Sequence, residues 1–272
     1  MIGTFSLHRF FRTITVAAAV VSPAAADDFH VENKIYNPHD KKAQPAETTT
    51  IFASGRVYDF MEAPAETIVF DPSQDLFLLL DPNRRMMTQV TTGDVSTEIT
   101  KLREAAQNHK SEAVREAAAA KFSESIDPKT GALKLTNRWM KYEVETMAPS
   151  QPQVARQYAE FADWMAQLNV LLRSADPPFP RLALNRVLRQ RQELPVKITR
   201  TTSAEEKSAF RLKEKESVIC SEHKILMALD KEDRERIEEA GREMHTFEKV
   251  SFEEYHRIQG EAQARAEASL KR

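Results

Sequence analysis

Short apolar runs separated by turns dominate residues 49–91, where every second residue tends to be apolar. That period is typical of β-strands, and the run LFLLL at residues 76–80 is apolar on both parities. Asp71-Pro72 and Asp81-Pro82 separate successive runs. Because proline presets the backbone at the second position of a turn, these pairs favour tight reversals. The pattern predicts a four-stranded antiparallel meander whose first strand runs through residues 49–61.

Helical spacing dominates three other segments. Residues 153–173 carry apolar side chains at i, i+4 and i+7, which predicts a long helix whose apolar stripe must be covered. Residues 94–121 and 230–258 are rich in charged side chains and predict exposed helices, the last of which starts at a capping box at Ser251. Additional strands are expected as a hairpin over 122–147 and at 194–202 and 207–229.

Hairpins outnumber β-α-β units, so the expected class is α+β with a mostly antiparallel sheet. One curved sheet, an incomplete barrel, that wraps the long apolar helix buries both apolar surfaces, and the charged helices are additions to it. Residues 49–258 are expected to form a single domain, followed by a solvated helical tail at 259–272. Residues 27–48 are polar and unpatterned, which predicts a flexible leader.

The first 26 residues have the features of a secretory signal peptide. Arg9 and Arg12 precede a short apolar stretch at residues 14–21, and Ala24-Ala25-Ala26 offers a cleavage site. We expect cleavage near Ala26 and a periplasmic or extracellular protein; an amphipathic or buried N-terminal helix is the alternative. The apolar stretch is shorter than the roughly 20 residues that span a bilayer, and no later stretch suffices, so no transmembrane span is expected.

Composition argues against several classes of enzyme. The chain has only 6 glycines, all far apart, and lacks GxGxxG, GxxxxGK[ST] and GxSxG. The formal charge is −2 and shows no basic bias, so we expect no nucleic-acid partner. The densest basic cluster fits the wet side of a short amphipathic helix and comprises Arg181, Arg186, Arg189 and Arg191.

Candidate chemistry is sparse. Cys220 and His223 are three apart on an expected strand, where they point to opposite faces, so they favour a small core thiol beside an exposed imidazole over a metal site. Glu143 and Glu145 share a strand face with Lys141 and could form an acid/base pair, but a solvated face explains them as well. We assign no catalytic residue, metal or cofactor, and expect a protein that is not an enzyme.

Aromatic and methionine side chains remain as candidates for a ligand site. Residues of this kind can line an apolar pocket for a lipid-like molecule, although packing against helix 153–173 is the reading that the pattern favours. The candidate pocket residues are Phe52, Tyr58, Phe60, Phe77, Met86, Trp139, Met140, Tyr142, Phe161 and Met165.

The run GRVYDFMEAPAETIVFDPSQDLFLLLDPNRRMMTQVTT and the later ELPVKITRTT resemble the strand rhythm of the bacterial lipoprotein-carrier (LolA/LolB-like) fold. The resemblance covers residues 55–91 and 194–220, while the charged segments at 94–121 and 230–272 have no counterpart. It implies an exported, incomplete antiparallel barrel closed by helices, whose concave apolar face accepts acyl chains. It transfers no individual binding residue, because it rests on pattern and order.

Two functions follow as hypotheses, and a third, a hydrolase, would require a cleft that brings Glu143 or Glu145 together with a histidine. The first is a non-enzymatic exported protein that binds an apolar ligand, a lipid or the acyl chains of a lipoprotein in the half-barrel. The second is an envelope-associated structural or protein-interaction module with a filled core, which contacts envelope proteins through the charged helices of residues 230–272.

Overall fold

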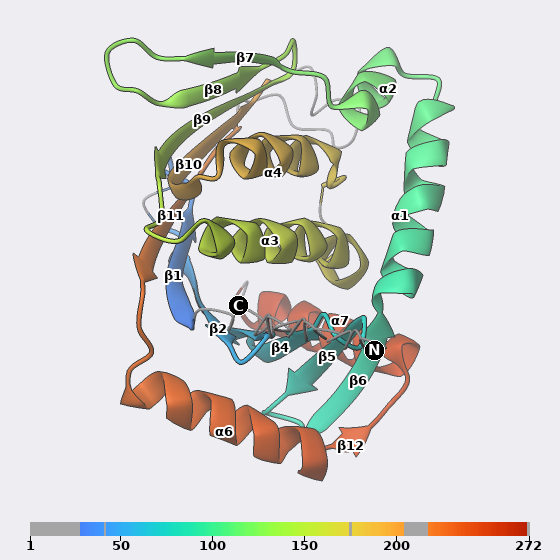
Figure 1. Ribbon diagram of the computed structural model, residues 1–272. Helices are drawn as coiled ribbons and strands as arrows, with labels where there is room; N and C mark the ends of the chain where they lie inside the picture. The colour runs from blue at the N-terminus through green and yellow to red at the C-terminus, as the bar shows by residue number, and fades with distance from the viewer. Residues whose placement is uncertain (1–27, 41, 174–175, 204–216, 271–272) are drawn as a thin grey trace, which may run out of the picture.

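The computed structural model describes residues 28–270 except 41, 174–175 and 204–216, and its strands form one large open sheet (Figure 1). Neighbouring strands follow the order β12-β6-β5-β4-β3-β2-β1-β11-β10-β9-β8-β7. The strands are β1 (Phe29–Tyr36), β2 (Ala46–Ala53), β3 (Arg56–Glu62), β4 (Ala65–Asp71), β5 (Leu76–Asp81), β6 (Met86–Thr91), β7 (Ser123–Ile126), β8 (Leu133–Thr136), β9 (Met140–Met147), β10 (Leu194–Thr202), β11 (Ser217–Leu226) and β12 (Glu248–Lys249). The helices are α1 (Thr92–Gln107), α2 (Glu112–Ala119), α3 (Pro152–Arg173), α4 (Phe179–Arg191), α6 (Lys231–Thr246) and α7 (Phe252–Leu270).

The expected mixture of helices with a mostly antiparallel sheet is confirmed. The strand pairs are antiparallel except for the short β12, which runs parallel to β6 at the edge of the sheet. The long apolar helix predicted at 153–173 is α3, and the charged segment 94–121 divides into α1 and α2. The capping box expected at Ser251 is present in part, because the Ser251 hydroxyl accepts the backbone N–H of Glu254 at 3.1 Å and α7 follows.

The meander has one more strand than the sequence predicts. Residues 49–61 are broken by a two-residue turn in which Ser54 and Gly55 have φ of 51° and 78°. Glycine adopts this left-handed conformation without a steric cost, so the pair closes a tight hairpin between β2 and β3. The reversal pairs Phe52 with Val57, which places Phe52 and Tyr58 on opposite faces of the sheet instead of one.

Residues 27–48 are not the expected flexible leader, because β1 lies inside the sheet. It pairs with β2 on one side and with β11 on the other, and Phe29 and Val31 are fully buried. Its sequence gives little strand signal because the next inward position is Asn33, whose amide donates to Thr48 at 3.1 Å and to Thr50 at 2.9 Å. Hydrogen bonds replace apolar contacts there, so the alternation of apolar residues stops.

Both faces of β2–β6 are covered (Figure 1). On one face, Phe70 and Phe77 pack with Phe161 and Leu168 of α3. On the other face, Val69 and Leu80 pack with Ala240 of α6 and with Phe247. Two apolar faces explain why LFLLL lacks alternation, since a strand between two layers buries both sets of side chains.

A buried hydrogen bond joins α6 to the centre of the sheet. Asp233 completes a capping box with Asp230 at the start of α6, and its Oδ2 lies 2.6 Å from Nδ1 of His30 on β1. Both residues are buried, at 6% exposure for His30 and 4% for Asp233. This contact fixes where the helix begins on the sheet.

In the part of the chain that the structure describes, none of the helices has both the length and the apolar content needed to cross a bilayer. The longest, α3, carries charged and amide side chains along its length, among them Arg156, Glu160 and Asp163.

Leu168→Ala should lower the free energy of unfolding by about 2–5 kcal/mol, because Leu168 is fully buried and its loss leaves a cavity under α3. Urea titration measures the change. Leu171→Ala on the same helix is the control, since Leu171 is only partly buried and should cost less. Equal losses of the free energy of unfolding in the two variants would contradict this packing of α3.

Candidate functional site

The ten candidate pocket residues do not line one cavity. Five of them, Phe52, Phe77, Met86, Phe161 and Met165, belong to the cluster between α3 and the sheet. Tyr58 and Phe60 lie on the opposite face against α6, and Met140 and Tyr142 pack with α4 in a third cluster. The prediction that these residues share a single pocket is therefore corrected: they belong to three packed clusters. The β2–β3 turn and the length of the sheet separate their side chains.

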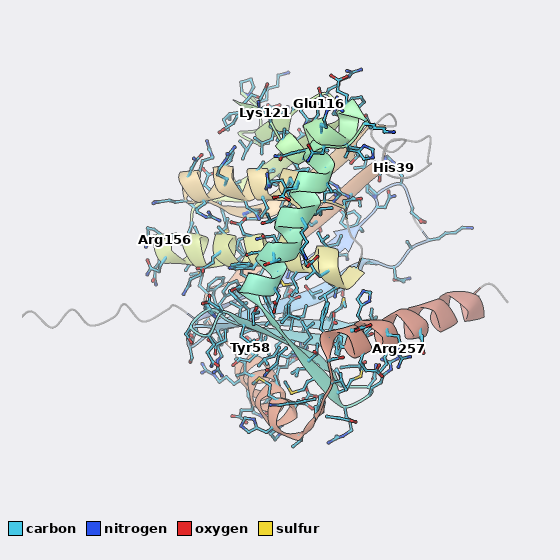
Figure 2. All side chains as sticks on the ribbon, turned by 90° about the vertical axis from the view of Figure 1, so that its right-hand side faces the viewer. His39, Tyr58, Glu116, Lys121, Arg156 and Arg257 are labelled. Atoms are coloured by element: carbon cyan, nitrogen blue, oxygen red, sulfur yellow. The ribbon has the colours of Figure 1, made fainter. Side chains whose placement is uncertain are left out.

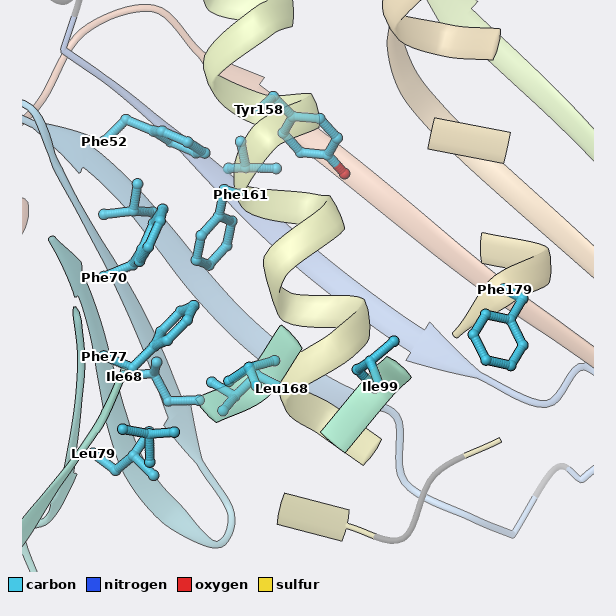
Figure 3. Close-up of a cluster of buried hydrophobic side chains, with 14 of the residues drawn as sticks. Phe52, Ile68, Phe70, Phe77, Leu79, Ile99, Tyr158, Phe161, Leu168 and Phe179 are labelled. Atoms are coloured by element: carbon cyan, nitrogen blue, oxygen red, sulfur yellow. The ribbon is translucent and has the colours of Figure 1, made fainter. Parts of the chain in front are cut away.

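The face of the sheet next to α3 is filled by side chains from both layers (Figure 3). Phe70 and Phe77 stack with ring centroids 4.6 Å apart, and Phe161 meets Phe52 edge-on at 5.7 Å. Phe77 and Leu168 are fully buried. Aromatic contacts at these distances are those of a close-packed interior, so this layer holds protein side chains where the sequence suggested a ligand.

The tenth residue, Trp139, lies apart from these layers. It precedes β9, its indole N–H donates to the carboxylate of Glu116 on α2, and the guanidinium of Arg138 lies 4.4 Å from its ring centroid. The bond to Glu116 connects α2 to the start of β9, so Trp139 has a packing role.

A groove of about 700 Å³ opens where α3 ends, between the β3–β4 hairpin and α7, and we call it the α3–α7 groove. Its walls are mainly apolar, and a few polar side chains converge at its floor. The lining residues are Met61, Ala63, Pro64, Ala65, Glu66, Asn83, Arg84, Leu172, Arg173, Tyr255, His256, Gln259 and Gly260.

The floor of the groove is a hydrogen-bonded polar cluster. Oε2 of Glu66 accepts a hydrogen bond from Arg173 at 2.6 Å, and its Oε1 accepts one from the Tyr255 hydroxyl at 3.1 Å. Asp81 lies next to it, where its carboxylate accepts from Arg84 at 2.5 Å and from the Gln259 amide at 2.8 Å. Strand, turn and helix thus each contribute to one site.

Burial shifts the titration of this cluster. It raises the pKa of Glu66 because it disfavours the carboxylate, and the Arg173 charge and the Tyr255 hydrogen bond offset only part of that effect. The pKa of Tyr255 is also raised, first by burial and then by the Glu66 charge beside it. Perturbed groups at the base of a pocket are typical of functional sites.

A second hollow of about 710 Å³ lies on the outer face of β1, β2, β10 and β11, and its character is different. More than half of its lining side chains are charged, and several of them pair with one another: Lys224 lies 2.9 Å from Glu32, and Lys197 lies 3.3 Å from Glu222. These are exposed ion pairs on a solvated sheet face, which contribute little and define no apolar pocket. The α3–α7 groove is therefore the better candidate.

A polar chain crosses the inner face of the sheet and ends at Asp59, whose carboxylate is close enough to Glu66 and Arg173 of the groove to be affected by their charges. The side-chain amide oxygen of Asn33 (Oδ1) lies 2.8 Å from Nδ1 of His223. Nε2 of the same imidazole lies 3.1 Å from the Ser221 hydroxyl. Through Thr50, Asn33 connects to Asp59, whose carboxylate accepts the threonine hydroxyl at 2.6 Å. Burial lowers the pKa of His223 to about 3 and raises that of Asp59.

The remaining candidates take structural positions. His223 is buried, not exposed as expected, and it points away from Cys220, whose Sγ lies 3.7 Å from the Thr199 hydroxyl. Over the described residues, no group of three or more His, Cys, Asp or Glu could hold a metal ion. Lys141 lies 2.7 Å from Glu143 and lowers its pKa, while Glu145 lines the outer hollow.

The basic cluster lies on α4, whose apolar side is buried at Leu184 and Leu188. Three of its arginines make local contacts: Arg181 with Asn185 at 2.9 Å, Arg189 with Asp163, and Arg191 with Glu193 at 2.9 Å. Arg186, Arg189 and Arg191 are exposed, as the wet side of an amphipathic helix requires, whereas Arg181 is only partly exposed and its charge acts on the buried Tyr158 and His223.

No protein-family model matches the chain, and no curated protein shows significant similarity to it.

The stability of the protein should depend on pH through Glu66. Its folded pKa lies above the ordinary 4.5, so the native state holds the proton longer and loses stability as pH rises from about 4.5 through the folded pKa. Glu66→Gln cannot titrate at this position. As the pH rises through this range, the free energy of unfolding of the unmodified protein should therefore fall relative to that of Glu66→Gln. Urea titrations at a series of pH values measure it; a parallel pH dependence of the two proteins would contradict the shift.

His223 should act in the opposite sense. Its folded pKa of about 3 lies below the ordinary 6.5, so the unfolded chain takes up the proton first as the pH falls. Compared with His223→Gln, the native protein should lose stability from pH 6.5 towards pH 3 at up to about 1.4 kcal/mol per unit. NMR titration of the imidazole checks the pKa directly, and a value near 6.5 would overturn the assignment.

Proposed function

We propose that this chain is an exported, non-enzymatic binding protein that holds a lipid-like, apolar ligand in the α3–α7 groove. The observation that supports it is the groove itself. Its volume of about 700 Å³ lies within the roughly 300–1,000 Å³ of small-molecule sites, and its apolar walls and few converging polar groups are typical of them.

The proposal moves the ligand from the centre of the sheet to the end of α3. We propose the curved sheet as a half-barrel scaffold around α3, as in the lipoprotein-carrier resemblance. The side chains of α3 occupy the position where that resemblance would put acyl chains. Ala63 and Pro64 of the β3–β4 hairpin and Tyr255 and Gly260 of α7 line the groove.

Export is part of the proposal and rests on the sequence. The basic residues, apolar stretch and alanine site that indicate a signal peptide end at Ala26, and they lie outside the described residues. β1 begins at Phe29, so cleavage near Ala26 would leave every described strand intact.

A protein-interaction module with a filled core is the second candidate. The observation that favours it is the close packing of both faces of β2–β6 by α3 and α6. On this view the exposed helices provide the contact surface, among them α7, which extends beyond the sheet and carries Arg257 (Figure 2). The two candidates differ in whether the groove takes up a small apolar molecule.

Gly260→Trp should block ligand binding without harming the fold. Gly260 lines the groove, its φ is not in the left-handed region, and a Cβ built on it meets no atom within 4 Å. The indole should fill the groove and reduce the affinity for N-phenyl-1-naphthylamine, a neutral apolar fluorescent probe, by about tenfold or more, which corresponds to about 1.4 kcal/mol. Probe fluorescence in a titration of the purified full chain measures the affinity.

Gly241→Trp is the matched control, because Gly241 is also helical with open space around its Cβ but lies on α6, away from the groove. It should leave probe binding unchanged. Failure of the unmodified protein to bind the probe, or equal loss in both variants, would contradict the proposal and favour the interaction module.

A further inference from the structure

Charge in the α3–α7 groove is arranged in layers. The two carboxylates are buried, since the side chain of Glu66 is 9% exposed and that of Asp81 is 0% exposed. Their partners reach solvent: the side chain of Arg173 is 39% exposed and that of Arg84 is 37% exposed. A molecule that enters the groove therefore meets the guanidinium groups before the carboxylates.

The buried acids are already satisfied by groups of the protein. Glu66 accepts from Arg173 and Tyr255, and Asp81 accepts from the Arg84 side chain, from the Arg84 backbone N–H at 3.0 Å and from Gln259. These bonds hold the acids in place, and the acids in turn hold the two guanidinium groups beside the groove.

Each guanidinium has more donors than these bonds use. A guanidinium carries five N–H groups in a planar fork that matches the oxygens of a carboxylate or a phosphate. In the described part of the chain, Arg84 donates one side-chain bond to Asp81, and Arg173 donates to Glu66, to Asn169 and, at 3.9 Å, to the sulfur of Met61. The remaining N–H groups can serve an anion, whose hydrogen bonds to a charged donor are strong.

We infer that the α3–α7 groove selects amphiphiles with an anionic head group, which Arg84 and Arg173 bind while the apolar chain lies against Met61, Pro64 and Leu172. The inference rests on the proposed function, because it names the ligand class of that same groove. The shared chemistry is a singly or doubly charged oxyanion on an apolar chain, as in a fatty acid or a lipid phosphate.

The test compares ligands that share one chain and differ in the head. Dodecanoate, dodecyl phosphate and 1-dodecanol each displace N-phenyl-1-naphthylamine from the protein at neutral pH, below their micelle-forming concentrations. We expect the better of the two anions to displace the probe at about tenfold lower concentration than the alcohol. Dodecanoate against dodecyl phosphate then distinguishes a carboxylate from a phosphate head.

Arg84→Gln should reduce the preference for the anion over 1-dodecanol, measured as a ratio within the same protein, to less than about threefold. Arg56→Gln is the matched control: Arg56 is 42% exposed and lies 2.8 Å from the buried Asp71 of the preceding Asp-Pro turn, but it does not line the groove. Urea titration checks that both variants fold. The preference of the unmodified protein should also fall between about 0.1 M and about 1 M salt, as screening requires.

Equal displacement by anions and alcohol, a preference that salt leaves unchanged, or a full preference in a folded Arg84→Gln protein would overturn the inference, while probe binding would still support the proposed function. Failure of the probe itself to bind would be the failure of the proposed function, and this inference would fall with it. The two failures are therefore distinguishable.

Discussion

The constraint on which the structure depends is that the central strands are apolar on both faces. Phe77 and Leu79 of β5 face α3, while Leu80 of the same strand packs in the cluster that contains Ala240 of α6. Leaving either face in water would cost roughly 25 cal/mol for each Å² of apolar surface, so the sheet needs a layer on each side. The order of the elements along the chain provides both layers, with α3 following β9 and α6 following β11.

The groove arises where this packing ends. α3 stops at Arg173 while the β3–β4 hairpin continues, and α7 returns beside it, so the three elements enclose a space that α3 no longer fills. Polar groups accumulate at this boundary because the carboxylates of Glu66 and Asp81 lie on strands that continue the buried faces. Pairing with arginines offsets the cost of burying them, and the same pairing leaves the cationic groups towards solvent.

Polar side chains are also buried in the middle of the sheet, where hydrogen bonds to other side chains take the place of ion pairs with arginine. Asn33 and His223 occupy inward positions of β1 and β11, where apolar residues would be expected from their neighbours Val31 and Ile225. Hydrogen bonds satisfy them, and burial of the imidazole keeps it neutral at ordinary pH. Because buried polar groups must have partners, such a chain fixes the register of the strands as firmly as apolar packing does.

The sequence alone determined the strands with strong alternation, the long helix at 153–173 and the antiparallel class, because these depend on local periodicity and turn chemistry. β1 was missed, since its inward Asn33 is satisfied by residues of β2 and β11 that lie far away in sequence. One sign of the groove was present: Glu66 shares a parity with Ile68 and Phe70, so an acid stood on a buried face. Its partners Arg173 and Tyr255 are separated from it by 107 and 189 positions, and only the tertiary structure, through burial and long-range hydrogen bonds, could bring them together.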